Sequence, residues 1–145
     1  MKILAENKRA YFDYQILEKL EAGIVLTGQE VKSIRLGNIN LKGSYLVPKD
    51  QEIYLIGCHI PPYQPKNITN YLPERTRKLL LKKREIGQLI GKSKVKGLTL
   101  LPLRVYIRGS FIKIEVGVVK RKKTRDKREI IKKREIDRDL KSSFR

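Results

Sequence analysis

The chain has 145 residues, which is enough for one domain and an appendage but too few for two ordinary domains. Its 34 Lys and Arg outnumber 15 Asp and Glu, and the resulting formal net charge of +19 favours a polyanionic partner such as a nucleic acid. Hydrophobic residues make up 40% of the chain, so a packed core is expected, and the single cysteine, Cys58, excludes an internal disulfide scaffold.

A membrane-spanning segment is not expected. The longest run without a charged residue, 53–65, contains several prolines and is shorter than the ~20 residues that a spanning helix needs. The N-terminal segment has only a short apolar patch among charged residues, so a signal peptide is not expected either. Together with the free thiol, these features predict a cytoplasmic protein.

The first part of the chain predicts strands and one short helix. Apolar and polar residues alternate over 12–16, and an apolar run follows at 24–26, which indicates one long strand that bends near Ala22–Gly23. Thr27 and Glu30 have the spacing of a capping box, so a short helix is expected to begin there and to end near Gly37. Next, residues 45–47 and 53–56 flank a polar turn and predict a hairpin.

The middle of the chain is less regular. Prolines over 59–73 predict a loop, and residues 79–81 are expected to form a short strand. Apolar residues at helical spacing predict a helix over 84–96, which Gly97 would end.

The strongest pattern follows that helix. Apolar and polar residues alternate over 101–108, the pair Gly109–Ser110 comes next, and alternation resumes over 112–118, so the segment predicts a hairpin. Cationic and aromatic side chains that bind phosphates and stack on bases are expected on its outer face. These residues are Arg104, Tyr106, Arg108 and Lys113.

Short strands with inserted helices predict a mainly β fold, namely a small β-barrel of the OB-fold type, closed or partly open, with a sandwich as the alternative. Residues 1–119 are expected to form this RNA-binding domain. Residues 120–145 form a basic tail with too few aliphatic residues to fold alone, so it is expected to be disordered. Ile136 and Leu140 are four residues apart, so the tail would form a helix on a partner surface; a solubilising tail is the alternative.

Catalysis finds little support in the residue types. His59 is the only histidine and adjoins the only cysteine, so neither a zinc site nor a catalytic Cys-His arrangement is expected. The acids Glu18, Glu21 and Glu30 have no spacing that fixes a metal or a general acid and base. In so basic a chain, a carboxylate would instead accept hydrogen bonds from bases or position an arginine. The chain is therefore predicted to be no enzyme and to need no cofactor and no metal.

Several short motifs occur in a fixed order along nearly the whole chain. They are Asn7–Ala10, Glu21–Ile24, Gly28–Ser33, Arg77–Leu81, Lys83–Glu85, Gly97–Thr99 and, in the tail, Lys122–Arg128. In this order and spacing, the motifs resemble those of the bacterial tmRNA-binding proteins known as the small protein B family. The chain departs from the family pattern at Phe12, where His is frequent, at Arg121, where Gly is usual, and at Ile136, which is aromatic in some members.

The resemblance implies an OB-type barrel that binds the tRNA-like part of tmRNA and delivers it to stalled ribosomes for trans-translation. The implied partners are tmRNA and the ribosome, at the small-subunit decoding centre and the message channel; a monomer with no membrane partner is expected. The residues alone leave two alternatives open. One is a ribosomal or initiation-type OB protein that acts without tmRNA, and the other is a small nuclease, for which an acidic metal cluster is missing.

The resemblance also assigns residues to two tasks. Family positions that match Asn7, Glu21 and Leu80 are associated with RNA binding, and neighbouring basic and aromatic residues extend this set. The predicted RNA-binding residues are Asn7, Lys8, Arg9, Phe12, Tyr14, Glu21, Lys32, Arg35, Arg77, Lys78, Leu80, Lys83 and Arg84. The tail residues predicted to act in the decoding centre are Lys122, Lys123, Asp126, Lys127, Arg128 and Ile136.

Overall fold

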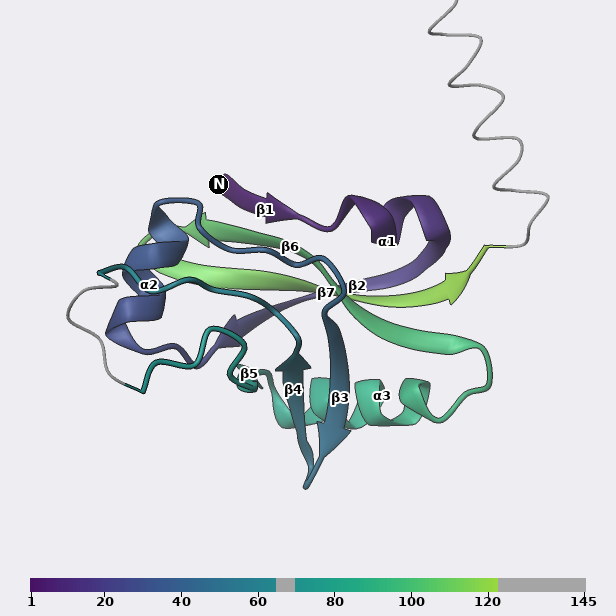
Figure 1. Ribbon diagram of the computed structural model, residues 1–145. Helices are drawn as coiled ribbons and strands as arrows, with labels where there is room; N and C mark the ends of the chain where they lie inside the picture. The colour runs from purple at the N-terminus through teal and green to yellow at the C-terminus, as the bar shows by residue number, and fades with distance from the viewer. Residues whose placement is uncertain (65–69, 123–145) are drawn as a thin grey trace, which may run out of the picture.

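The computed structural model describes residues 1–64 and 70–122 (Figure 1). Within these ranges the chain forms seven strands and three helices. They are β1 (Lys2–Glu6), α1 (Lys8–Asp13), β2 (Tyr14–Ile24), α2 (Gly28–Arg35), β3 (Tyr45–Lys49), β4 (Glu52–Ile56), β5 (Arg77–Leu80), α3 (Lys83–Ser93), β6 (Leu98–Arg108) and β7 (Phe111–Arg121). In this part of the chain, no helix is both long and apolar enough to cross a membrane.

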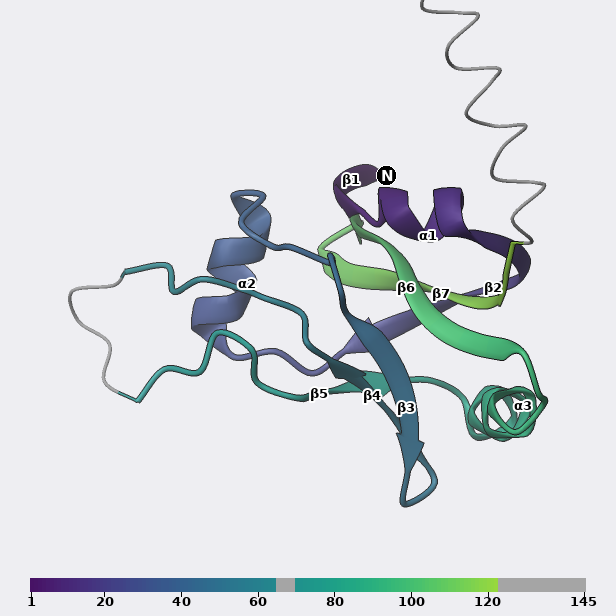
Figure 2. The ribbon, with the colours of Figure 1, turned by 45° about the vertical axis from the view of Figure 1, so that its right-hand side comes forward.

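The seven strands form one antiparallel sheet in the order β1-β6-β7-β2-β5-β4-β3. The sheet twists so that β3 passes close to β6, as Figure 2 shows. The predicted mainly β fold is confirmed, but the sheet is not closed into a barrel, because β1 and β3 remain its two edges in the described structure. Pro48 lies in the edge strand β3, where its missing N–H group does not interrupt the sheet.

The long hairpin predicted around Gly109–Ser110 is confirmed as β6 and β7, and Gly109 has a positive φ of 62° at the turn. Strand β2 runs beside β7 over nearly its whole length. The prediction of one long strand is therefore confirmed, but its irregularity lies elsewhere. The register shifts between Ile16 and Glu18 and is regular at Ala22–Gly23, so the bulged residue is Leu17.

Helix α1 and strand β1 were not predicted. The alternation over 12–16 indicated a strand from Phe12 onward, yet residues up to Asp13 are helical. The reason is the cap at Asn7, whose Oδ1 accepts a hydrogen bond from the Ala10 N–H at 3.2 Å while its Nδ2 donates to the Pro102 carbonyl at 2.9 Å. A partner so distant in sequence leaves no local signal.

The other predicted elements are confirmed with shifted ends. The capping box of α2 is present, with reciprocal hydrogen bonds between Thr27 and Glu30. The hairpin of β3 and β4 turns at Asp50 and Gln51, which both have positive φ. Strand β5 and helix α3 begin slightly earlier than their patterns indicated. The described parts of the loop over 59–73 contain no helix or regular strand.

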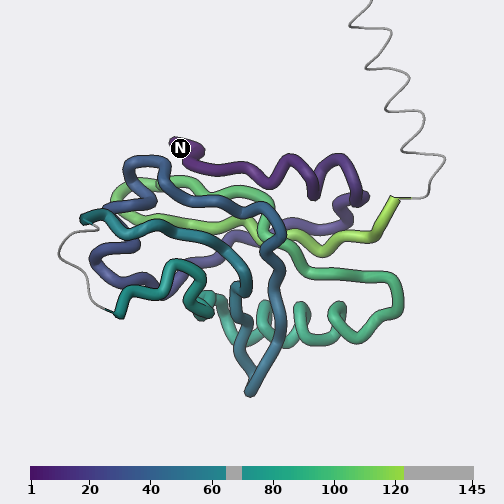
Figure 3. The backbone as a smooth tube through the Cα atoms, viewed as in Figure 1, coloured from purple at the N-terminus to yellow at the C-terminus, as the bar shows by residue number. Residues whose placement is uncertain are grey.

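Two apolar clusters pack on the two faces of the sheet. The larger one lies on the inner face and includes Ile34 of α2, Leu89 of α3 and the inward-facing Ile114 of β7. The smaller one lies on the outer face, where Ala10 of α1 packs on Leu103 and its neighbours. Figure 3 accordingly shows α1 and α3 on opposite sides of the central strands. Helix α1 thus covers one end of the outer face.

The end of β7 bears on the predicted domain boundary after residue 119. Lys120 and Arg121 still pair with β2, and the Lys122 N–H donates to the Asp13 carbonyl at 2.9 Å. The hydrogen-bonded chain therefore continues through Lys122. The division into a folded domain and a tail stays a prediction, since residues 123–145 lie outside the described residues.

Candidate nucleic-acid interface

The register of four strands places distant residues side by side on the outer face. Gly23 of β2 pairs with Leu80 of β5 on one side and with Lys113 of β7 on the other. Lys113 in turn pairs with Tyr106 of β6. Paired residues of antiparallel strands direct their side chains to the same face, so these positions form one row across the sheet.

Two further rows flank this one. On the side toward α1, Glu21 pairs with Glu115, which pairs with Arg104. On the side toward the hairpin tip, Phe111 pairs with Arg108. Lys78 lies two residues before Leu80 and therefore on the same side of β5. We call this surface the sheet face: Glu21, Gly23, Lys78, Leu80, Arg104, Tyr106, Arg108, Phe111, Lys113 and Glu115.

Glu21 is held in place on the sheet face, in the row toward α1. Its Oε1 accepts a hydrogen bond from the Tyr106 hydroxyl at 2.6 Å and forms an ion pair with Arg108 Nε at 3.1 Å. Burial, and then the hydrogen bond to Glu21, raise the pKa of Tyr106 to about 12, so its hydroxyl remains a donor at neutral pH. The Glu21 side chain is 36% exposed, and this fixed carboxylate is therefore accessible to a partner.

A second acid, Glu115, connects the sheet face to α1. Arg104 NH2 donates to its Oε2 at 2.8 Å, and the Tyr11 hydroxyl donates to its Oε1 at 3.4 Å. The hydrogen bond with Glu115 raises the pKa of Arg104, and burial followed by the Glu115 charge raises that of Tyr11. Sequence reasoning missed Glu115, although strand alternation places it on the same face as Arg104.

The predicted residues of α1 fall into two groups. Lys8 and Arg9 are exposed, whereas Asn7 is buried by its capping role and therefore positions the helix. Phe12 is half-buried, as is Tyr14, which lines an open hollow of about 290 Å³ together with Arg9 and the ring of Tyr45.

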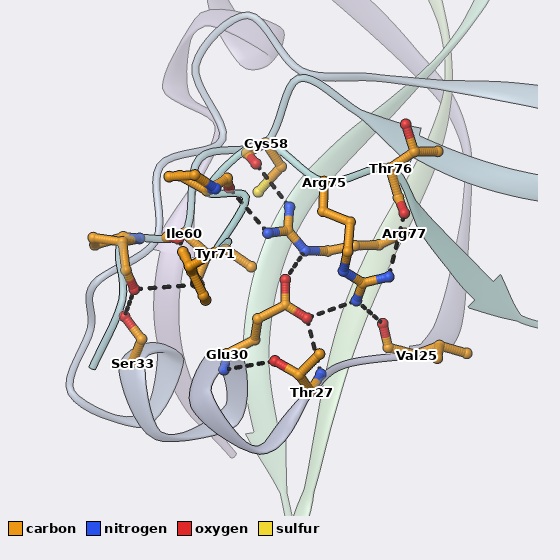
Figure 4. Close-up of polar contacts among 12 residues, drawn as sticks. Val25, Thr27, Glu30, Ser33, Cys58, Ile60, Tyr71, Arg75, Thr76 and Arg77 are labelled. Carbon is orange, nitrogen blue, oxygen red and sulfur yellow. Dashed lines mark hydrogen bonds and ion pairs between the residues drawn. The ribbon is translucent and has the colours of Figure 1, made fainter. Parts of the chain in front are cut away.

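Arg77 differs from its predicted role, because its side chain is fully buried. Its guanidinium donates to the Glu30 carboxylate and, at 2.8 and 3.0 Å, to the carbonyls of Cys58 and Pro73 (Figure 4). Arg75 NH2 also donates to Glu30, at 2.6 Å. Arg77 thus fixes the loop before β5 onto α2 and offers no surface for RNA in this structure. The residue type alone does not indicate that Arg77 is buried.

The remaining predicted residues lie on α2 and at the start of α3. Arg35 NH2 donates to the Ser110 carbonyl at 3.1 Å and so ties α2 to the hairpin tip. The Lys32 ammonium lies 5.5 Å from the centroid of the Tyr63 ring. Lys83 and Arg84 are exposed at the start of α3, just beyond the end of β5.

Residues with ligand-type side chains show no cluster in the described ranges. No group of three His, Cys, Asp or Glu gathers there in a geometry that would hold a metal ion. His59 Nδ1 lies 3.7 Å from Glu74, and Cys58 is buried, which raises the pKa of its thiol to about 11.

Comparison with known proteins identifies the family. A family model described as SmpB protein matches residues 4–145. The chain belongs to the SmpB family. Within it, the SsrA-binding protein of Carboxydothermus hydrogenoformans is 52% identical over 144 residues, which cover 99% of this chain and 97% of that relative. The SsrA-binding protein of Geobacillus kaustophilus is 51% identical, with coverage of 99% and 93%.

A solved structure also resembles this SmpB-family chain. It is described as "tmRNA-SmpB: a journey to the center of the bacterial ribosome", with a TM-score of 0.70 and 45% identity over 83% of this chain and 85% of that one. The resemblance inferred from the sequence motifs is therefore confirmed.

Proposed function

We propose that this protein binds the tRNA-like part of tmRNA and delivers it to stalled ribosomes for trans-translation. Two similar proteins are named for binding SsrA RNA, and the similar solved structure is described by tmRNA, SmpB and the ribosome. In this chain, the observation that carries the proposal is the open sheet face. There a fixed, accessible carboxylate lies beside the largely exposed Arg108 and on the same face as an exposed leucine, Leu80.

The positive and negative side chains have different roles in RNA binding. Exposed cations of α1 and α3, such as Lys8, Arg9, Lys83 and Arg84, bind phosphates and set the orientation of the RNA. A carboxylate repels phosphate but accepts hydrogen bonds from base amino and imino groups. Glu21 therefore disfavours an arbitrary stretch of backbone at its position on the face and favours an RNA that presents a base edge there.

The tail has a separate role in this proposal. Lys123, Asp126, Lys127, Arg128 and Ile136 act in the ribosomal decoding centre, as the family resemblance implies; all five lie outside the described residues. Lys122 belongs to the same predicted set and is described. Its Nζ donates to the Tyr11 carbonyl at 3.1 Å, so Lys122 lies beside α1. RNA binding and ribosome engagement would then use adjacent parts of one protein, with no reaction catalysed by it.

The ribosomal or initiation-type alternative that the residues alone left open is not favoured, since the chain belongs to the SmpB family. Such a protein would share the sheet and the charge but would bind RNA without preferring tmRNA. Specificity for one RNA, rather than affinity for RNA in general, therefore distinguishes the two candidates.

Glu21→Ala should weaken binding to the tRNA-like domain of tmRNA by about tenfold or more, because a charge-assisted hydrogen bond is lost. Binding to an unrelated structured RNA should stay equal or tighten, since the change removes a negative charge. Gel shifts with both transcripts at one fixed salt concentration measure the two affinities.

Glu18→Ala is the matched control. Glu18 lies on the same strand and is half exposed, and its carboxylate pairs with Lys92 at 3.5 Å, away from the sheet face. The substitution removes the same charge and should leave the preference for tmRNA unchanged. Equal losses in both variants, or no loss in either, would remove Glu21 from the site.

A further inference from the structure

Phe111 is exposed at the tip of the long hairpin. It is the first residue of β7, and 67% of its surface is open to solvent. It belongs to neither apolar cluster of the described residues. Water-exposed aromatic surface contributes little to folding, so the core gives no reason for a phenylalanine at this position.

The ring lies within the sheet face rather than beside it. Phe111 pairs with Arg108 and shares its side of β7 with Lys113, two residues along the strand. Exposed Leu80 lies in the row next to that of Phe111, and Gly23 separates Leu80 from Lys113. The backbone of Gly23 does not have a positive φ, so its conformation does not demand glycine.

Gly23 leaves the middle of that row without a side chain. A Cβ at this position would lie 3.2 Å from Leu80 Cβ, so even alanine would crowd its neighbour. Between Leu80 and Lys113 the row therefore presents backbone rather than a side chain, next to the row of Phe111.

One cation lies beside the ring, and two more contact or belong to neighbouring residues. The Lys113 ammonium lies 5.7 Å from the ring centroid of Phe111. The Arg108 guanidinium lies 5.8 Å from the ring of Tyr106 and remains largely exposed. Arg35 binds the carbonyl of Ser110, the residue directly before Phe111. An exposed aromatic face with cations at its rim is the arrangement on which proteins stack unpaired bases while they bind the adjoining phosphates.

We infer that Phe111 is a stacking platform for one unpaired base of the bound RNA, with Lys113 and Arg108 on the adjoining phosphates. The inference rests on the proposed function and deepens it, because it assigns a loop nucleotide to the hairpin tip. A base inside a duplex is already stacked on both faces and cannot cover the ring, whereas a base that leaves the stack can.

Three substitutions separate stacking from simple apolar contact. Phe111→Ala and Phe111→Leu should each weaken binding of the full chain to the transcribed tRNA-like domain of tmRNA by about tenfold or more, because stacking of one base is lost. Leucine retains apolar area but has no π face. Phe111→Trp should bind within about twofold of the original protein, since it retains the stacking surface. All three should melt at the original temperature, because the ring is exposed.

Leu72→Ala is the matched control, because Leu72 is 65% exposed but lies in the loop before β5. It should not alter binding. A blunt RNA duplex without unpaired bases is the second probe, and it should bind Phe111→Ala and the original protein equally. Wild-type affinity of Phe111→Leu for the transcript, or an equal loss for the duplex, would overturn the stacking role. So would Phe111 variants that bind the transcript normally and lose only ribosome binding.

The same series distinguishes this inference from the proposed function. If Glu21→Ala loses its preference for tmRNA while every Phe111 variant binds normally, only the stacking platform is wrong. If the original protein shows no preference for tmRNA, the proposed function is wrong. In that case, a loss on Phe111→Ala that is confined to RNA with unpaired bases would still establish the platform.

Discussion

Glu30→Ala should lower the free energy of unfolding by about 3–5 kcal/mol, since removing one partner of a buried ion pair leaves the other charge uncompensated. Only 1% of Glu30 is exposed, and its carboxylate accepts hydrogen bonds from Arg75 and from the fully buried Arg77. Without this acid, the Arg77 guanidinium would keep only carbonyl partners in a buried site. Urea denaturation monitored by circular dichroism measures the change.

Glu85→Ala provides the control for the lost helix cap. Glu85 makes the corresponding contact at the start of α3, where its Oε1 accepts from the Lys82 N–H at 2.9 Å at an exposed position. Its removal should cost about 1 kcal/mol or less. If both variants lowered the free energy of unfolding by similar amounts, the buried network of Glu30 would stabilise the protein no more than an ordinary helix cap does.

The effect of Glu30→Ala should also depend on pH. Burial by itself would raise the pKa of Glu30, but hydrogen bonds from Arg75, the Thr27 backbone and Arg77 bring it below its ordinary value of 4.5. A carboxyl with a lowered pKa stabilises the folded state above its unfolded pKa, and that contribution is lost as the pH falls through the folded pKa. The difference between the two proteins should therefore be constant near neutrality and shrink below pH 4.5.

Deletion of residues 123–145 should abolish transfer of the stalled peptide to tmRNA while tmRNA binding stays within a few fold. The truncated chain keeps the sheet face, the end of β7 and the backbone contact of Lys122 with Asp13. Truncation after residue 119 would instead remove paired residues of β7 and confuse loss of tail function with damage to the sheet. The missing segment carries basic residues suited to an RNA-lined channel.

Binding and transfer are measured on one preparation, by gel shift and by peptide transfer on ribosomes programmed with a truncated message. Changing Asp126, Lys127 and Arg128 together to Ala in the full chain should give the same result without loss of length. If the tailless protein supported peptide transfer at the normal rate, the tail would act only as a solubilising segment.

Elements with a local signal could be predicted from the sequence. The β6–β7 hairpin follows from strict alternation around Gly109, and α2 follows from the Thr27 and Glu30 box, because neighbours in the chain supply the stabilising contacts. Helix α1 could not be predicted, since Asn7 depends on a carbonyl of β6. Sheet closure depends on contacts between the two ends of the strand order, and no short motif encodes these.

The candidate site, too, could be predicted from the sequence only in part. Family motifs identified Glu21 and Leu80, but only the strand register shows that they share a surface with Phe111. Arg77 belongs to a family motif and, as a cation, is predicted to bind RNA. Its burial depends on Glu30, 47 residues away, and on loop carbonyls, so residue type alone could not reveal it.

The identity of the RNA that this protein carries in cells tests its specificity for tmRNA most directly. The full chain, its Glu21→Ala variant and its Glu18→Ala control are each purified from cells, and the bound RNA is sequenced. We expect tmRNA to be enriched with the original protein and the control and to be lost with Glu21→Ala. Recovery of ribosomal or transfer RNA in proportion to its abundance, with no enrichment of tmRNA, would contradict the proposed function.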